Sequence, residues 1–188
     1  QGAFRRLMAG SDDISPIRIE VADDVLDDLR TRLRATRWPD AAPGASWEYG
    51  TDLTSLREAC EYWADGYDWR DAEQRLNSFD HVTTTIDGQN IHFVHAPSPE
   101  PDALPLVLTP GWPGSSVEFL AVSEPLRDPA AHGGDTADAF HVVCPSLPGY
   151  AWSGPTNEPG WDVRRVAAAW ATLMDRLGYG RYGAQGGD

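Results

Sequence analysis

Apolar and polar residues alternate at helical spacing in the first 80 residues of the chain. A first helix is predicted from Asp23, its plausible cap, to a stop before Pro39. A second helix is predicted from about Leu53 to Trp63, and a short third one over residues 69–79. We expect these segments to form a helical meander without a sheet of its own. The predicted inner faces consist of Val25, Leu26, Leu29 and Leu33 in the first helix and of Leu56, Cys60 and Trp63 in the second.

The period changes at residue 81. β-branched and aromatic residues flank the pair Asp87-Gly88, which is the strongest short signal for a β-hairpin. Strand-like runs then alternate with helical patterns, in the order strand, helix, strand, helix, strand. This order predicts a mostly parallel sheet with helices packed on both faces. The strands are expected within 104–110, 140–148 and 181–188, and the helices within 115–128 and 161–178.

Helix-capping signals support both predicted helices of this second part. Ser115 or Ser116 can cap the first of them, while Asp162 can cap the second and Gly178 can close it. We therefore divide the chain into a tag-like or disordered leader (1–14), a helical meander (15–80) and an α/β region (81–188).

Composition and charge exclude several classes of function. The 188 residues carry a formal net charge of −14, which disfavours binding to nucleic acid or to an anionic membrane. No run of 18 apolar residues predicts a membrane span. Two cysteines, Cys60 and Cys144, are too few for a disulfide scaffold, and we expect a cytoplasmic protein.

No cofactor or metal site is predicted. The stretch GYGRYG at 178–183 matches a dinucleotide fingerprint, but it follows a predicted helix and leads into a strand, which is the reverse of the required order. No two histidines lie at i, i+4 on a predicted helix, and we expect His92 and His95, which face opposite sides of a strand, to be hydrogen-bonded or exposed. The five histidines are His81, His92, His95, His132 and His141.

Two loops follow predicted strands, where ligands gather in parallel sheets. TPGWPGSS (109–116) is either a plain turn that needs glycine or a loop whose backbone N–H groups face a developing negative charge. SLPGYAWSGP (146–155) is either a loop whose Tyr150 and Trp152 pack on the core or a wall of the same crevice. The residues alone leave both alternatives open.

The last six residues, GAQGGD, run from a predicted strand through glycines to Asp188. A strand that enters a tight turn is the geometry of a nucleophile elbow. No G-x-S-x-G occurs, so Asp188 is the candidate at the apex, with only the first half of the pattern readable.

These motifs, in this order, resemble epoxide hydrolases of the α/β-hydrolase fold that carry an N-terminal meander, the group of the microsomal-type enzymes and bacterial relatives. The resemblance covers residues 15–188 and rests on RIEVADDVLDDLRTRLRATRWPD, WEYGTDLTSLREACEYW, IDGQNIHFVHAPS, GWPGSSVEF, PSLPGYAWSGP and RYGAQGGD. The fold it implies agrees with the predicted α/β order.

The resemblance implies a mechanism and a set of site residues. Asp188 would be the nucleophile that opens an oxirane to a vicinal diol through an alkyl-enzyme ester, and the Trp112 backbone N–H would be half of an oxyanion hole. The substrate would be a small apolar epoxide in contact with Trp112, Pro113, Tyr150 and Trp152. The Trp112–Pro113 peptide is expected to be cis, as in the resembling loops.

The sequence also departs from the family pattern. The residue before Gly-Trp-Pro is Pro110 instead of the usual histidine, so an imidazole and an N–H are missing there. The family places the cap tyrosines, a second acid and the water-activating histidine after the nucleophile. We therefore expect this chain to be the first half of an enzyme that is completed by a C-terminal half. A homodimer is left open.

Two other functions compete with epoxide hydrolysis. A hydrolytic dehalogenase would use the same Asp188 to displace a halide, although the meander favours the epoxide hydrolases. A non-catalytic binding fragment would use the fold only as a scaffold.

Overall fold

The computed structural model describes residues 14–44 and 46–187, which form two compact units. One unit is Ile19–Arg75, and the other combines the described residues up to Arg18 with those from Leu76 onward. Most of the predicted leader (1–14) lies outside the described residues.

The Ile19–Arg75 unit is helical. It contains α1 (Asp23–Arg34), the short η1 (Trp47–Tyr49), α2 (Leu53–Glu61), the π-helical turn η2 (Tyr62–Gly66) and α3 (Trp69–Leu76, whose last residue belongs to the other unit). The predicted cap of the first helix was wrong by one residue: Ala22 is the N-cap, without a side-chain hydrogen bond, and Asp23 lies in the first turn. A carboxylate there still interacts favourably with the helix dipole.

The predicted inner face of α2 is not covered by the described residues. Leu56 is 40% exposed, and Trp63, in the π-helical turn, is 49% exposed. On α1, Leu26 is buried but Val25 is 56% exposed. Helical spacing identifies which residues share a face, whereas burial depends on a packing partner, so this part of the prediction was wrong.

The second unit is built on a six-stranded sheet of order β1-β2-β3-β5-β4-β6. β4 is parallel to both β5 and β6, whereas β1, β2, β3 and β5 are joined by antiparallel pairings. The prediction of a mostly parallel sheet was therefore wrong: the sheet is mixed. The strands are β1 (Ser15–Ile17), β2 (His81–Ile86), β3 (Gln89–Ala96), β4 (Leu104–Thr109), β5 (Phe140–Pro145) and β6 (Gly183–Gly186).

The antiparallel half begins at the predicted hairpin. Asp87 and Gly88 connect β2 to β3 with φ angles of +54° and +75°, the left-handed pair of a type I′ turn. The Asp87-Gly88 prediction is confirmed.

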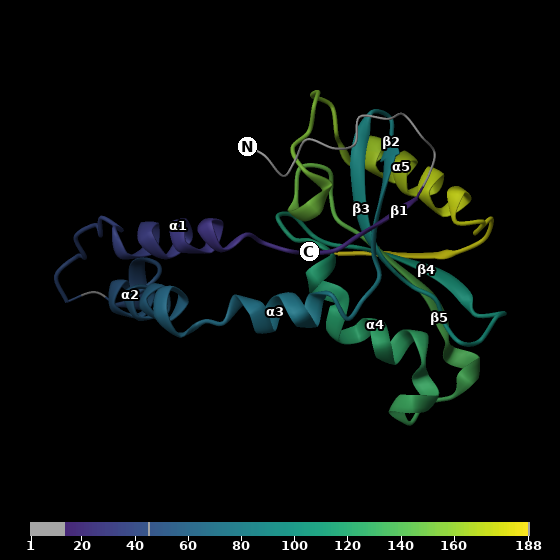
Figure 1. The fold of residues 1–188 in the computed structure, drawn as a ribbon, viewed down its shortest axis with the longest axis horizontal. Helices are drawn as coiled ribbons and strands as arrows, with labels where there is room; N and C mark the ends of the chain where they lie inside the picture. The colour runs from purple at the N-terminus through teal and green to yellow at the C-terminus, as the bar shows by residue number, and fades with distance from the viewer. Residues whose placement is uncertain (1–13, 45, 188) are drawn as a thin grey trace. The chain divides into compact units, whose positions relative to one another are not determined.

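The sheet separates two apolar cores. Neighbouring residues of a strand point to opposite faces, so Val107 and Val143 pack under α5 while Leu108 and Val142 lie on the face of α4. Figure 1 shows the two helices on opposite sides of the sheet. The helices of this unit are η3 (Ser116–Phe119), α4 (Leu120–Arg127), η4 (Pro129–His132), η5 (Thr136–Asp138), η6 (Ala151–Ser153) and α5 (Val163–Arg176).

Both predicted caps are present. Ser115 accepts from the Val117 N–H at the start of η3, and its own N–H donates to the Glu118 carboxylate, which completes a capping box. Asp162 accepts from the backbone N–H groups of Arg164 and Arg165 at the start of α5. No helix of the described residues has the length and apolar character that a membrane crossing requires.

Candidate active site

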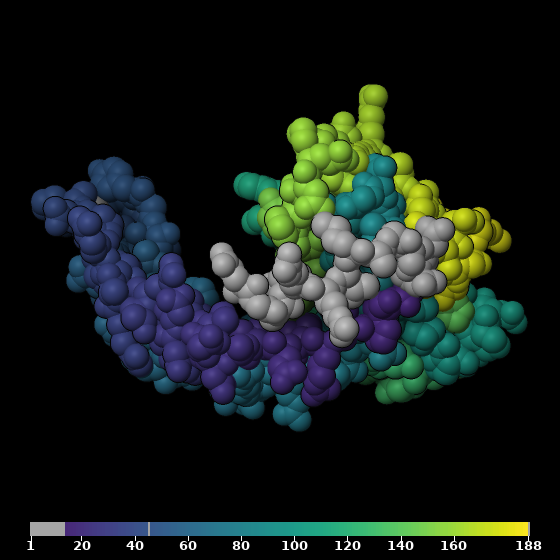
Figure 2. Space-filling model, turned by 45° about the horizontal axis from the view of Figure 1, so that its top comes forward, coloured from purple at the N-terminus to yellow at the C-terminus, as the bar shows by residue number. Residues whose placement is uncertain are grey.

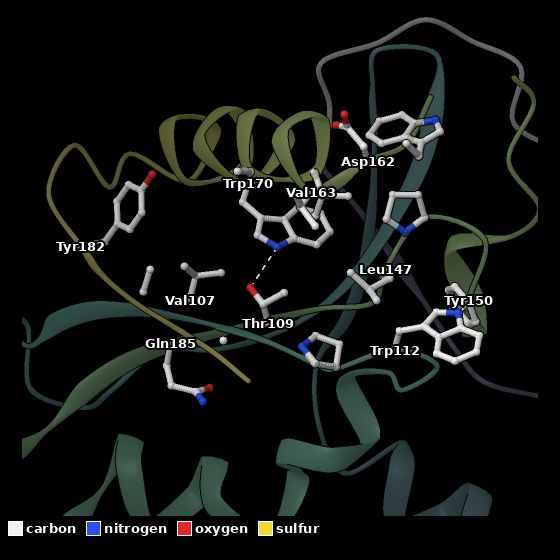
Figure 3. A pocket seen from close by; sticks show the side chains of 17 residues that line it. Val107, Thr109, Trp112, Leu147, Tyr150, Asp162, Val163, Trp170, Tyr182 and Gln185 are labelled. Atoms are coloured by element: carbon white, nitrogen blue, oxygen red, sulfur yellow. Dashed lines mark hydrogen bonds between the residues drawn. The ribbon is translucent and has the colours of Figure 1, made fainter. Parts of the chain in front are cut away.

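A cavity of about 990 Å³ lies at the carboxyl ends of β4 and β6, beside α5 (Figure 3). Its walls are mostly apolar and aromatic, so it suits a small apolar ligand. The lining residues are Val107, Thr109, Pro110, Trp112, Leu147, Pro148, Tyr150, Trp161, Asp162, Val163, Val166, Ala167, Trp170, Tyr182, Ala184, Gln185 and Gly186.

One wall comes from the loop after β4. The Trp112–Pro113 peptide is cis, as predicted, and the Gly114 N–H donates to the Gly111 carbonyl at 2.6 Å. A Cβ at Gly114 would lie 1.3 Å from Oε1 of Glu118 and 2.9 Å from the Gly111 carbonyl oxygen, so only glycine leaves the loop in place. The Trp112 N–H has no acceptor among the described residues.

The loop after β5 forms a second wall. Its Tyr150 hydroxyl accepts a hydrogen bond from Nε1 of Trp112, so the structure brings these two predicted site residues together. The Trp112 side chain is 70% exposed. A tyrosine hydroxyl that accepts one hydrogen bond still has its own proton to donate. Residues 155–160, which follow in the chain, are exposed, and this segment stands out from the surface in Figure 2.

Trp152 and Pro113 do not line this cavity. The Trp152 ring lies edge-on to two imidazoles, with centroid distances of 5.2 Å to His92 and 5.8 Å to His81. Trp152 therefore packs on this pair of histidines and not on the cavity.

The edge strand β6 supplies the third wall and leads to the predicted nucleophile. Parallel pairing places Gly186 opposite Thr109, the residue just before the Trp112 loop. Two residues further along the chain is Asp188, which lies outside the described residues.

Helix α5 closes the cavity from above the sheet. Nε1 of Trp170 donates to Oγ1 of Thr109 at 3.0 Å, so the indole is fixed across the carboxyl end of β4 (Figure 3). Arg165 stacks on the Trp161 ring with its guanidinium carbon 4.2 Å from the ring centroid. Asp162 is the carboxylate of this wall, and it is engaged as the helix cap.

The histidines among the described residues lie elsewhere. His81 and His92 form a buried pair, Nε2 of His95 lies 3.0 Å from the Tyr179 hydroxyl, and none of the three lines the cavity. Nor do His132 and His141. Within the described ranges, no group of three or more His, Cys, Asp or Glu side chains is placed to hold a metal ion. The described walls therefore offer hydrogen-bond donors and an apolar surface, but no histidine base.

Sequence reasoning missed five polar or aromatic lining residues, among them Asp162, which was predicted only as a helix cap. Trp161 and Tyr182 flank α5, Gln185 lies on β6, and Trp170 was predicted only as part of a helix face. In Figure 3 the Gln185 amide points away from α5. The alternation along the predicted strand 181–188 could have placed Tyr182 and Ala184 on one face, but no motif marks Trp161.

Comparisons with known proteins agree with this architecture. A family model described as "Epoxide hydrolase N terminus" matches residues 14–119. A putative epoxide hydrolase of Stigmatella aurantiaca is 50% identical over 175 residues, which is 93% of this chain and 40% of the relative. Epoxide hydrolase 1 of Sus scrofa is 34% identical over 188 residues, which is 98% of this chain and 41% of the relative.

Solved structures show the same likeness. The crystal structure of juvenile hormone epoxide hydrolase from Bombyx mori matches with a TM-score of 0.84 and 32% identity over 95% of this chain and 47% of that one. The structure of Aspergillus niger epoxide hydrolase matches with a TM-score of 0.82 and 35% identity over 94% of this chain and 46% of that one. The chain thus spans less than half the length of these relatives.

Proposed function

Since the chain belongs to the epoxide hydrolase family, whose N-terminal region matches residues 14–119, we propose a function for the complete protein. We propose that it opens an oxirane to a vicinal diol through an ester on Asp188. The observation that carries the proposal is the apolar cavity where the Trp112 loop and β6, the strand that leads to Asp188, lie side by side.

The first step is a displacement at carbon. The Asp188 carboxylate attacks an oxirane carbon, a C–O bond of the three-membered ring breaks, and the ring oxygen leaves as an alkoxide that takes a proton from an acid. A carboxylate suits this step because it is ionised at neutral pH. The product of the step is an alkyl-enzyme ester with a neighbouring hydroxyl.

The second step is hydrolysis of that ester. Water attacks the Asp188 carbonyl carbon and gives its proton to a base, and negative charge develops on the carbonyl oxygen. The Trp112 N–H, which has no acceptor among the described residues, is proposed as one donor to that oxygen. Cleavage of the ester releases the diol and restores the carboxylate.

The substrate proposed for this cavity is a small apolar epoxide. The aromatic walls supply the apolar contact, and the Tyr150 hydroxyl can donate a hydrogen bond to a ligand oxygen. We propose that the remaining acid, the water-activating histidine and the epoxide-polarising tyrosines come from the rest of the polypeptide, because the relatives extend well beyond the span that this chain matches.

An oxygen-label experiment tests the proposal. In a single turnover in H₂¹⁸O, attack at the ester carbonyl puts the label into the Asp188 carboxylate, and the diol carries the unlabelled enzyme oxygen. The complete protein would be mixed in excess with an aryl epoxide, and peptide and product masses would be measured. Label in the first diol instead of in Asp188 would contradict the ester mechanism.

The matched variants are Asp188→Asn and Asp102→Asn. A neutral amide is a poor nucleophile, so Asp188→Asn is expected to lose turnover by several orders of magnitude. Asp102 is exposed on the turn before β4 and does not line the cavity, so Asp102→Asn is expected to keep wild-type activity. The peptide mass also checks that the introduced amide has not deamidated back to the carboxylate. Wild-type ester formation in Asp188→Asn would refute the assignment.

A further inference from the structure

A hydrogen-bonded chain of buried polar side chains, which we call the buried chain, lies on the α4 face of the sheet, beneath the loops that wall the cavity. It joins His81 of β2, His92 of β3, Ser146 directly after β5 and Ser116 at the start of η3. His81 is 3% exposed and the other three are fully buried. The Trp152 ring makes T-shaped contacts with both imidazoles. None of these five residues lines the cavity.

The donor and acceptor roles in the buried chain follow from its His81 end. Nε2 of His81 lies 2.8 Å from the Leu76 carbonyl oxygen, which can only accept, so His81 carries its proton on Nε2. Its Nδ1 is then an acceptor, and Nε2 of His92, 2.9 Å away, must donate to it. Nδ1 of His92 is left as an acceptor for the Ser146 hydroxyl at 3.0 Å.

Both imidazoles must be neutral for this order to hold. Burial, with a smaller contribution from the neighbouring His81, lowers the pKa of His92 to about 3. Burial also lowers the pKa of His81, against the opposing effects of the Leu76 carbonyl and Asp80. At neutral pH each ring is therefore locked in a single tautomer.

The Ser146 end of the buried chain reaches the segment that follows the Trp112 loop. The Ser146 hydroxyl also lies 3.3 Å from Oγ of Ser116. Because Ser146 gives its one proton to His92, its oxygen accepts from the Ser116 hydroxyl and from the Ser116 backbone N–H, which is 3.4 Å away. Ser116 follows Ser115, the residue that caps the helix start after the Gly111–Gly114 turn. The oriented Ser146 hydroxyl thus holds one end of the segment that carries the Trp112 N–H.

The wall that carries Tyr150 has an anchor of its own, the Ser153 hydroxyl. The Ser153 hydroxyl accepts from the His92 N–H at 3.1 Å and donates to the Ser146 carbonyl at 2.8 Å. These are backbone groups, so a change of the Ser146 side chain leaves them in place. The loop that carries Tyr150 is therefore anchored independently of the Ser146 hydroxyl.

We propose that His81, His92 and Ser146 are positioning residues that hold the Trp112 N–H in place for hydrolysis of the Asp188 ester. This inference rests on the proposed function. Its specific content is that the buried chain acts on the second chemical step, in which the Trp112 N–H takes part, and not on the attack by Asp188.

The test compares two buried serines of the complete protein. Ser146→Ala removes the hydroxyl that links His92 to Ser116. The matched control is Ser123→Ala, because Ser123 is equally buried on the same sheet face but bonds to the Phe119 carbonyl and Cys144 instead. Ser146→Thr keeps a hydroxyl and serves as the conservative rescue.

Rapid-quench intact mass would follow formation and breakdown of the ester with an aryl epoxide. We expect Ser146→Ala to slow ester breakdown by about tenfold to hundredfold, the range for a misplaced group, while ester formation stays within about twofold of wild type. Ser123→Ala is expected to change neither rate by more than about twofold, and Ser146→Thr to recover most of the breakdown rate. Equal breakdown rates in the two alanine variants, or an equal slowing of both steps in Ser146→Ala, would overturn the inference.

If no epoxide is turned over, the proposed function fails. Two further measurements test the buried chain and its hold on the segment after the Trp112 loop without any turnover. Imidazole ¹⁵N shifts of the wild type should show His81 and His92 protonated on Nε2 with a bare Nδ1. Amide exchange at Ser116 and Val117 should be faster in Ser146→Ala than in Ser123→Ala. A proton on Nδ1 of His92, or unchanged exchange, would contradict the buried chain as we describe it.

Discussion

At the scale of single residues, the fold opposes protonation of His92. Its ring is fully buried between His81, Ser146 and Trp152, and burial lowers its pKa from 6.5 to about 3. A positive charge there would need a new acceptor for the Nδ1 proton, and the Ser146 hydroxyl is already turned toward it. The arrangement is stable only while the ring is neutral.

This burial predicts a dependence of stability on pH. Between pH 6.5 and 3, His92 binds a proton in the unfolded chain but not in the native one, so the free energy of unfolding falls as the pH falls. From pH 6.5 to 4.5 this group contributes a loss of at most about 2–3 kcal/mol. The pKa of His81 is also lowered, so His81 adds to the loss of stability in the same direction. The titratable and charged groups around His81 are Asp80, Arg18 and His95, which line the 430 Å³ cavity that His81 borders.

Urea unfolding at a series of pH values would check it, with His92→Gln against His132→Gln. His132 is exposed, so its replacement is expected to leave the pH profile unchanged. His92→Gln should be less stable at pH 7 but show a shallower decline toward pH 4.5. Profiles that stay parallel in the two variants would show that His92 is not the titrating group.

At the scale of elements, the two main helices start differently. α1 begins at Ala22 without a side-chain cap, whereas Oδ1 of Asp162 accepts from the N–H groups of Arg164 and Arg165 at 3.0 and 2.9 Å. α5 packs Trp170, Leu173 and Met174 into the core beneath it. Its first turn also borders the cavity, so a frayed start would loosen that wall.

We predict that Asp162→Ala lowers the free energy of unfolding by about 1–2 kcal/mol, because two backbone N–H groups lose their acceptor. Asp162→Ser keeps an oxygen at the cap position and should recover most of the loss. Urea unfolding of the complete protein measures both, and the m value should not change. A loss in Asp162→Ser as large as in Asp162→Ala would rule out capping as the cause.

At the scale of the whole molecule, the described residues leave apolar surface and a strand edge uncovered. β6 pairs with β4 alone among the described strands, and Ala184, Gln185 and Gly186 are exposed. In the helical unit, Trp47, Tyr49 and Tyr62 are each more than 60% exposed. An open strand edge is a template for pairing with another chain.

We therefore expect residues 1–188, expressed alone, to self-associate and to be inactive toward epoxides. Light scattering coupled to size-exclusion chromatography would measure this, with the complete protein as reference for its own oligomeric state. Gln185→Lys places a charge on the β6 edge and should reduce association, whereas Gln74→Lys, at an exposed position of α3, should not. A soluble, active monomer of 1–188 would contradict the prediction.

The candidate site was partly predictable for a topological reason. Trp112 and Tyr150 each follow a strand whose carboxyl end was expected at one edge of the sheet, and they meet there. Trp152 carries a similar sequence signal but packs on His81 and His92 instead of lining the cavity. Sequence spacing gives no information on which side of such a turn a ring will lie.

The sequence by itself determined the local elements. Asp87-Gly88 specifies its hairpin because both residues accept positive φ, and the helical repeat with Asp162 at its start specifies α5. Only the tertiary structure decided how those elements pair: the antiparallel contact of β3 with β5 joins the hairpin to the parallel strands in one mixed sheet, and it brought His92 to Ser146 across 54 positions. Such contacts depend on which distant strands bury each other's side chains, and a local pattern carries no record of that choice.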